Sequence, residues 1–166
     1  KPRAVKVGMV NDIDTINAIA DTLANYDIQH LVVDPVMVAT SGARLMQDEA
    51  VEVFTKKLLP IASLLTPNVP EAEVLAGIPI NDKDSMEKAA HIIHSKGCKA
   101  LLIKGGHIEG RKIDRLYTAM GMEREYEAAN VATRNTHGTG CTLSSAITSY
   151  LAIGYAIGEA IAAAKE

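Results

Sequence analysis

The chain has 166 residues, of which 48% are hydrophobic and 22% charged, and its formal net charge is −3 at pH 7. This length suits one domain with a sizeable core, spanning residues 1–166, and is short for two. The small negative charge and the lack of a basic face argue against nucleic acid as a partner, and no apolar run is long enough to cross a membrane. Two cysteines, Cys98 and Cys141, are too few for a disulfide framework, so we expect a reducing cytoplasm.

Both ends of the chain suggest a piece of a longer protein. The chain opens without an initiator Met on a strand-like stretch, residues 4–9, and it stops inside a helical run, residues 157–166, that has no stop signal. We therefore expect the C-terminal part of a longer protein, trimmed at both ends.

Apolar runs and helical periodicities alternate along the chain. The strands expected from the apolar runs are residues 4–9, 31–36, 61–65 and 99–103. The helices expected from apolar residues three and four apart are residues 13–23, 47–59, 70–76, 85–95, 143–153 and 157–166. Residues 115–118 and 123–127 look like a polar hairpin. Apolar strands separated by helices indicate an α/β fold, with a mostly parallel sheet covered by helices on both faces.

Helix caps support these boundaries. Asn11 or Asp12 is placed to cap the first helix, and Gly77 is placed to end the helix over residues 70–76. Asp84 together with Glu87 is expected to form a capping box at the next helix.

Polar residues follow the expected parallel strands, at the edge of the sheet where such folds bind ligands. Asp34 follows the second strand, Asn68 and Glu71 follow the third, and Lys104 ends the fourth. A pair of carboxylates, Asp34 and Glu71, suits magnesium, which takes one or two protein carboxylates together with waters and phosphate oxygens. Taken singly, Asp34 is equally well explained as a turn cap and Glu71 as a favourable acid in the first turn of a helix.

Two lysines are candidates for binding phosphates. Lys104, at a strand end, can place a point charge along phosphate groups, or it is an ordinary surface residue. Lys165, on the last helix, serves the same purpose or simply faces solvent.

The stretch Asn135-Thr136-His137-Gly138-Thr139-Gly140-Cys141-Thr142 reads as a glycine loop that opens a helix. Gly138 and Gly140 permit positive φ angles and leave no Cβ in the way of a ligand. The free N–H groups and positive dipole end of the helix suit an anion, and they favour the thiolate form of Cys141 in its first turn. Cys141 is thus a candidate proton acceptor in phosphoryl transfer. The alternative is a tight loop before a packing helix, with an ordinary buried cysteine.

These residues together resemble the ribokinase-like superfamily, and within it the hydroxymethylpyrimidine/phosphomethylpyrimidine kinases of thiamine biosynthesis. The resemblance covers essentially the whole chain, and a cysteine after the glycines, where most of the superfamily has an aspartate, resembles the pyrimidine-kinase branch. The matching motifs are Val7-Gly8-Met9, Val33-Asp34-Pro35-Val36-Met37 with Ser41-Gly42, Leu65-Thr66-Pro67-Asn68-Val69-Pro70-Glu71-Ala72, Lys104-Gly105-Gly106-His107 and the glycine loop.

The resemblance implies two ATP-dependent phosphorylations, first of 4-amino-5-hydroxymethyl-2-methylpyrimidine and then of its monophosphate to the diphosphate, in the cytoplasm. It also implies a homodimer. By position, Cys141 is implied as the catalytic base, with Gly138, Thr139 and Gly140 as the anion hole. The remaining implied roles fall into three groups. Magnesium binding is implied for Asp34 and Glu71, and nucleotide binding for Asn68, Lys104, Thr139 and Lys165. Binding of the pyrimidine is implied for Met9, Val36 and Cys141.

Two departures from the family pattern affect what we expect. The family usually carries a lysine where this chain has Thr40, and the first third of the family's length is absent. The nearest alternative is a pyridoxal or pyridoxine kinase of the same branch, whose substrate is also a flat ring with a hydroxymethyl group. A third possibility is a catalytically silent module that binds a nucleotide or vitamer.

Overall fold

The structure is a computed structural model that describes residues 1–38, 44–106, 113–127 and 138–166. The strands are β1 (Ala4–Val7), β2 (His30–Val33), β3 (Leu64–Leu65), β4 (Ala100–Gly106), β5 (Ile113–Thr118) and β6 (Gly121–Glu127). The helices are α1 (Ile13–Leu23), α2 (Asp48–Lys57), α3 (Val69–Ala76), α4 (Lys83–Ser95), α5 (Thr139–Ala152) and α6 (Ile157–Ala164), with one 3-10 turn, η1 (Leu59–Ile61).

The six strands form one sheet in the order β1-β2-β3-β4-β5-β6. Strands β1 to β4 are parallel, and β5 and β6 extend the sheet as an antiparallel hairpin. The expected α/β fold with a mostly parallel sheet is therefore confirmed.

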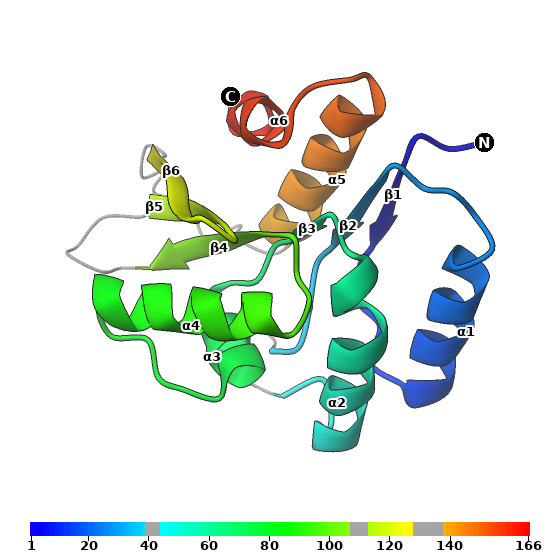
Figure 1. Cartoon of the computed structure of the whole chain (residues 1–166), viewed down its shortest axis with the longest axis horizontal. Helices are drawn as coiled ribbons and strands as arrows, with labels where there is room; N and C mark the ends of the chain where they lie inside the picture. Colours follow the sequence, from blue (N-terminus) through cyan, green and yellow to red (C-terminus); the bar gives the residue numbers. More distant parts are fainter. Residues whose placement is uncertain (39–43, 107–112, 128–137) are drawn as a thin grey trace.

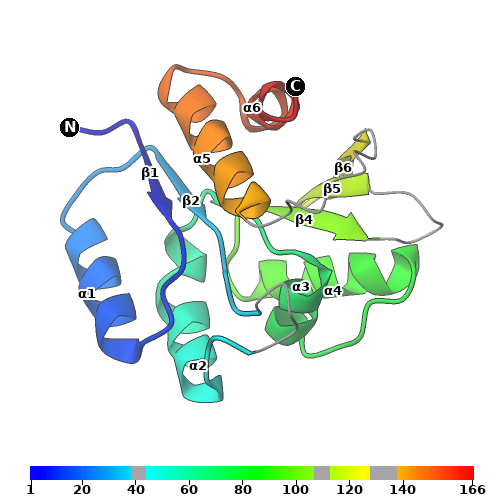
Figure 2. The ribbon, with the colours of Figure 1, turned by 180° about the vertical axis from the view of Figure 1, so that it is seen from behind.

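Helices cover the sheet on both faces (Figures 1 and 2). Helices α1 to α4 lie on one face, and α5 and α6 lie on the other. Successive residues of the central strands point into different cores: Leu31 and Val33 join the cluster under α1 to α4, whereas Val32 joins the cluster under α5 and α6. This alternation explains the continuous apolar runs, because both faces of each strand are buried.

The helix caps agree with the sequence at α1 and differ at α4. Of the two cap candidates for α1, the structure uses Asp12, whose carboxylate accepts from the N–H groups of residues 14 and 15. Helix α4 begins at Lys83, so the expected box of Asp84 with Glu87 is wrong. Asp82 caps the helix instead, accepting from Ser85 N at 2.7 Å, because its extended backbone places it one residue before the first turn.

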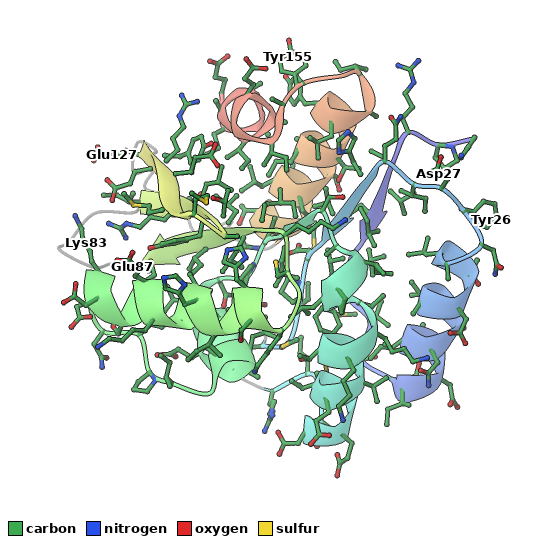
Figure 3. The ribbon with its side chains drawn as sticks, viewed as in Figure 1. Tyr26, Asp27, Lys83, Glu87, Glu127 and Tyr155 are labelled. Atoms are coloured by element: carbon green, nitrogen blue, oxygen red, sulfur yellow. The ribbon has the colours of Figure 1, made fainter. Side chains whose placement is uncertain are left out.

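The hairpin is longer than expected, and its first strand is not a polar surface. Arg115 in β5 is only 1% exposed, and its Nε donates to Glu125 Oε1 at 2.8 Å. The Nζ of Lys83 lies 4.0 Å from the same carboxylate, and Figure 3 places Lys83 at the start of α4 near the hairpin. The charge of Arg115 is therefore paired within the protein, which a count of polar residues does not reveal.

In the part of the chain that the structure describes, no helix is both long and apolar enough to cross a membrane.

Candidate active site

The residues predicted at the strand ends lie together because three parallel neighbours, β2, β3 and β4, end at the same edge. Backbone hydrogen bonds join these ends: Thr66 N donates to Val33 O at 3.0 Å, and Lys104 N donates to Pro67 O at 2.7 Å. Asp34 N likewise donates to Val7 O at 2.9 Å. Backbone hydrogen bonds alone therefore hold these strand ends next to one another.

The carboxylate of Asp34 is the centre of the site. Its Oδ1 accepts from Lys104 Nζ at 2.9 Å and from Thr66 Oγ1 at 3.1 Å, and its Oδ2 accepts from Ser144 Oγ at 3.1 Å. Asp34 is 1% exposed, so its charge needs these partners in place of water. Asp34 therefore does more than cap a turn.

Asn68 and Glu71 form a reciprocal capping box at the start of α3. Asn68 Oδ1 accepts from Glu71 N, and Glu71 Oε2 accepts from Asn68 N, both at 2.8 Å. Glu71 Oε1 also accepts from Met37 N at 3.4 Å. Burial raises the pKa of Glu71, and the N–H group of Asn68 and the positive charge of Lys104 oppose that rise. Glu71 therefore fills the role of an acid in the first turn of α3. Its carboxyl group also lies close to the charged groups of Lys104 and Asp34.

Helix α5 begins with the geometry expected of the glycine loop. Gly138 is the N-cap residue with φ 80° and ψ −4°, a left-handed conformation that favours glycine. Cys141 lies in the first turn and is exposed, which excludes the buried alternative. The helix has no side-chain cap and no acid in its first turn, so this end retains the positive field that attracts an anion.

Gly140 is needed for a different reason from Gly138. It does not have a positive φ, but a Cβ built on it would lie 3.0 Å from Lys104 Nζ. The ammonium group of Lys104 therefore rests directly against the first turn of α5. A positive side chain and the positive end of a helix meet at this point, which is electrostatically favourable only beside negative charge. Asp34 supplies that negative charge from the end of β2.

Lys165 is held by an acid that the sequence analysis did not single out. Its Nζ forms an ion pair with Asp114 Oδ2, and its side chain is only 13% exposed, so it does not simply face solvent. Asp114 Oδ1 accepts from Gly105 N at 2.6 Å, next to Lys104 in the chain. In the sequence, Asp114 could have been recognised as an acid that lies within a strand and needs a partner once that strand is buried. Ser144, also missed, lies three residues after Cys141 on the same helix.

Met9 and Val36, the residues implied for the pyrimidine pocket, follow the carboxyl ends of the parallel strands β1 and β2 but are not buried together. Met9 lies beyond the end of β1 and is 62% exposed, and Val36 is half-buried two residues after Asp34. Met37 and Met46, in contrast, belong to the core. Thr40, Ser41, Gly42, His107 and residues 135–137 lie outside the described residues.

The phosphomethylpyrimidine kinase family matches the chain over residues 1–166. The chain belongs to this family.

Named relatives agree with that membership. The chain is 47% identical over 162 residues to a thiamine biosynthesis bifunctional protein of Geobacter sulfurreducens, covering 97% of this chain and 33% of that protein. It is 44% identical to a hydroxymethylpyrimidine/phosphomethylpyrimidine kinase of Rhizobium meliloti, covering 98% of this chain and 61% of that enzyme. The chain thus spans less than two thirds of the length of either curated relative.

A solved structure of a related kinase has the same fold. The ADP complex of Bacillus subtilis pyridoxal kinase superposes with a TM-score of 0.88 at 36% identity, covering 98% of this chain and 62% of that one. The fold is therefore the ribokinase-like one expected from the motifs.

The contact between Gly140 and Lys104 generates a prediction about phosphate binding. We expect Gly140→Ala to weaken binding of ATP roughly tenfold or more, because the new methyl group displaces the ammonium from the helix end. The measurement is the Kd for ATP by calorimetric titration. Gly158→Ala is the matched control, since Gly158 is also the second residue of its helix and its Cβ would lie 3.4 Å from Tyr126 Oη. Equal Kd values for the two variants would contradict the prediction.

Proposed function

We propose that the protein transfers the γ-phosphoryl group of ATP to the hydroxymethyl group of 4-amino-5-hydroxymethyl-2-methylpyrimidine, and then a second one to the resulting monophosphate, in thiamine biosynthesis. The observation that carries this proposal is the Lys104 ammonium, which Asp34 holds against the helix end that bears an exposed Cys141. The names of the Rhizobium and Geobacter relatives support the substrate and the pathway.

Cys141 is the proposed catalytic base. The substrate hydroxyl oxygen attacks the γ-phosphorus, the bond from that phosphorus to ADP breaks, and the hydroxyl proton passes to the Cys141 sulfur. Gly138, Thr139 and Gly140 lie in the same turn and are the proposed anion hole, whose N–H groups stabilise charge on the transferred group.

The proposed phosphate contacts are consistent with the hydrogen bonds already present. An ammonium group has three N–H donors, so Lys104 and Lys165 each retain donors for phosphate oxygens while paired with Asp34 and Asp114. Asn68, at the cap of α3 beside Lys104, is the third proposed nucleotide contact. Met9 and Val36 are the proposed contacts of the pyrimidine ring.

Magnesium is the proposed cofactor, and the donor set fits it. Asp34 and Glu71 are two buried carboxyl groups close enough for the charge of one to raise the pKa of the other. Magnesium keeps several of its waters and would neutralise phosphate charge between these carboxylates and ATP. Since both carboxylates already accept hydrogen bonds, we propose that they act on the hydrated ion.

Glu71 makes the magnesium requirement depend on pH. Its pKa is raised above 4.5 by burial, so the carboxylate is protonated, and stops attracting a cation, at a higher pH than an ordinary glutamate. We expect the magnesium concentration for half-maximal rate to rise as the pH falls from about 7 to about 5, and this rise to be smaller in Glu71→Gln. Glu49→Gln, in the exposed first turn of α2, is the control. If the magnesium requirement of Glu71→Gln rose with falling pH as steeply as that of the parent protein, Glu71 would keep its capping role alone.

Alkylation tests the role of Cys141. Cys141 is exposed, whereas burial raises the pKa of Cys98 to about 12 and keeps it an unreactive thiol. We expect iodoacetamide to abolish turnover by modifying Cys141, ATP to slow that modification, and Cys141→Ala to lose at least about a hundredfold in kcat. Peptide mass spectrometry locates the modified residue. Full activity of Cys141→Ala would exclude the proposed base.

The second candidate is a pyridoxal kinase, favoured by the structural match to the Bacillus subtilis enzyme. The deciding measurement is ADP release by the full-length protein with magnesium-ATP and, in parallel, hydroxymethylpyrimidine, its monophosphate or pyridoxal. We expect turnover on both pyrimidines and little on pyridoxal. Turnover on pyridoxal alone would keep the mechanism and replace the substrate, and ATP binding without any turnover would indicate a silent module.

Two further expectations belong to the proposal. The cysteines of the described residues are both free, which is consistent with a cytoplasmic protein. A homodimer is the expectation from the family resemblance.

A further inference from the structure

Ser144 is a buried polar residue to which the proposed mechanism gives no part. Its side chain is fully buried in helix α5, one turn after Cys141, and its hydroxyl lies 3.1 Å from Asp34 Oδ2. The same hydroxyl lies 3.1 Å from the carbonyl oxygen of Cys141. A hydroxyl group has one proton to donate, and a carboxylate is the stronger acceptor, so the proton goes to Asp34.

This hydrogen bond joins two parts of the site that belong to adjacent layers, the sheet and helix α5. Asp34 follows β2 in the sheet, and its other oxygen, Oδ1, accepts from Lys104 Nζ at 2.9 Å. One carboxylate therefore contacts both the lysine and the helix, and it fixes their separation. The Lys104 ammonium lies so close to α5 that a Cβ on Gly140 would be 3.0 Å away, so a small movement of the helix would open or close this contact.

We propose that Ser144 is a positioning residue, which holds the first turns of α5, and with them Cys141, in register with the Asp34–Lys104 ion pair. The geometry explains why a serine occupies a fully buried position of a helix whose other buried residues there are Ile147 and Leu151. This inference rests on the proposed function, because the alignment of Cys141 with Lys104 matters to catalysis only if both take part in phosphoryl transfer.

Thr66 offers a matched control for Ser144. Its hydroxyl also donates to Asp34 at 3.1 Å, and its side chain is also fully buried, but it comes from the end of β3 and not from α5. Ser144→Ala and Thr66→Val each remove one hydroxyl from the same carboxylate and leave it two donors. A general effect of weakening the Asp34 network would appear in both variants, whereas loss of helix position would appear only in Ser144→Ala.

The first measurement is the rate constant for alkylation of Cys141 by iodoacetamide, which requires no turnover. We expect Ser144→Ala to slow alkylation about threefold or more, because the first turn of α5, which carries Cys141, moves away from the positive charge of Lys104 beside Gly140. Thr66→Val and Ser145→Ala, the latter at an exposed position of the same helix, should stay within about twofold of the parent. Equal rate constants for Ser144→Ala and the parent, or equal slowing in Ser144→Ala and Thr66→Val, would overturn the proposal.

The second measurement is the split between kcat and KM on hydroxymethylpyrimidine, with active sites counted by ATP titration. Ser144→Ala should lower kcat about tenfold to a hundredfold with little change in KM, because the base is misplaced while the ring contacts remain. A fall in kcat matched by Thr66→Val would again overturn the proposal. If the parent protein turns over neither pyrimidine, the proposed function fails, and the alkylation experiment still decides the role of Ser144.

Discussion

A single buried carboxylate, that of Asp34, contacts groups from three other segments of the chain. Its oxygens accept from Lys104 at the end of β4, from Thr66 after β3 and from Ser144 in α5. A buried carboxylate without partners is costly, and removing one partner of such a network leaves the others uncompensated. The arrangement of the strand ends and of α5 at this point therefore depends on keeping the charge of Asp34 satisfied.

The same carboxylate allows two positive groups to lie together before any ligand is bound. The start of α5 has no acid and no side-chain cap, and the ammonium of Lys104 lies against it. These two positive groups would repel each other in a poorly solvated region unless a negative group were close. Asp34 balances them from the sheet side and leaves the outer side for the proposed phosphate, so the site would be organised before its ligand binds.

Most of this arrangement follows from the sequence, and the parts that do not follow from it have two different physical reasons. Apolar strands, the glycines and the polar strand ends predict the parallel sheet and the meeting of Asp34, Asn68, Glu71 and Lys104, because these depend on local patterns and on topology. Hydrogen bonds between distant side chains leave no such pattern. Ser144 looks like an ordinary helix residue, and the ion pair of Asp114 with Lys165 joins positions 51 residues apart. The cap at Asp82 was missed for another reason, since Asp84 offers the same chemistry two residues later.

The two lysines near the proposed phosphates are arranged by the same principle. Lys104 pairs with Asp34 and Lys165 pairs with Asp114, and each aspartate also accepts from a second group, which fixes the direction of the carboxylate. Asp114 accepts from Gly105 N, the residue after Lys104, so the position of Lys165 is tied to the backbone that carries the other lysine. Two flexible side chains are thus ordered in the absence of ligand, and the entropy lost on binding phosphate is smaller than for free lysines. The aspartates therefore matter to the proposed phosphate binding even though their charge has the same sign as that of phosphate.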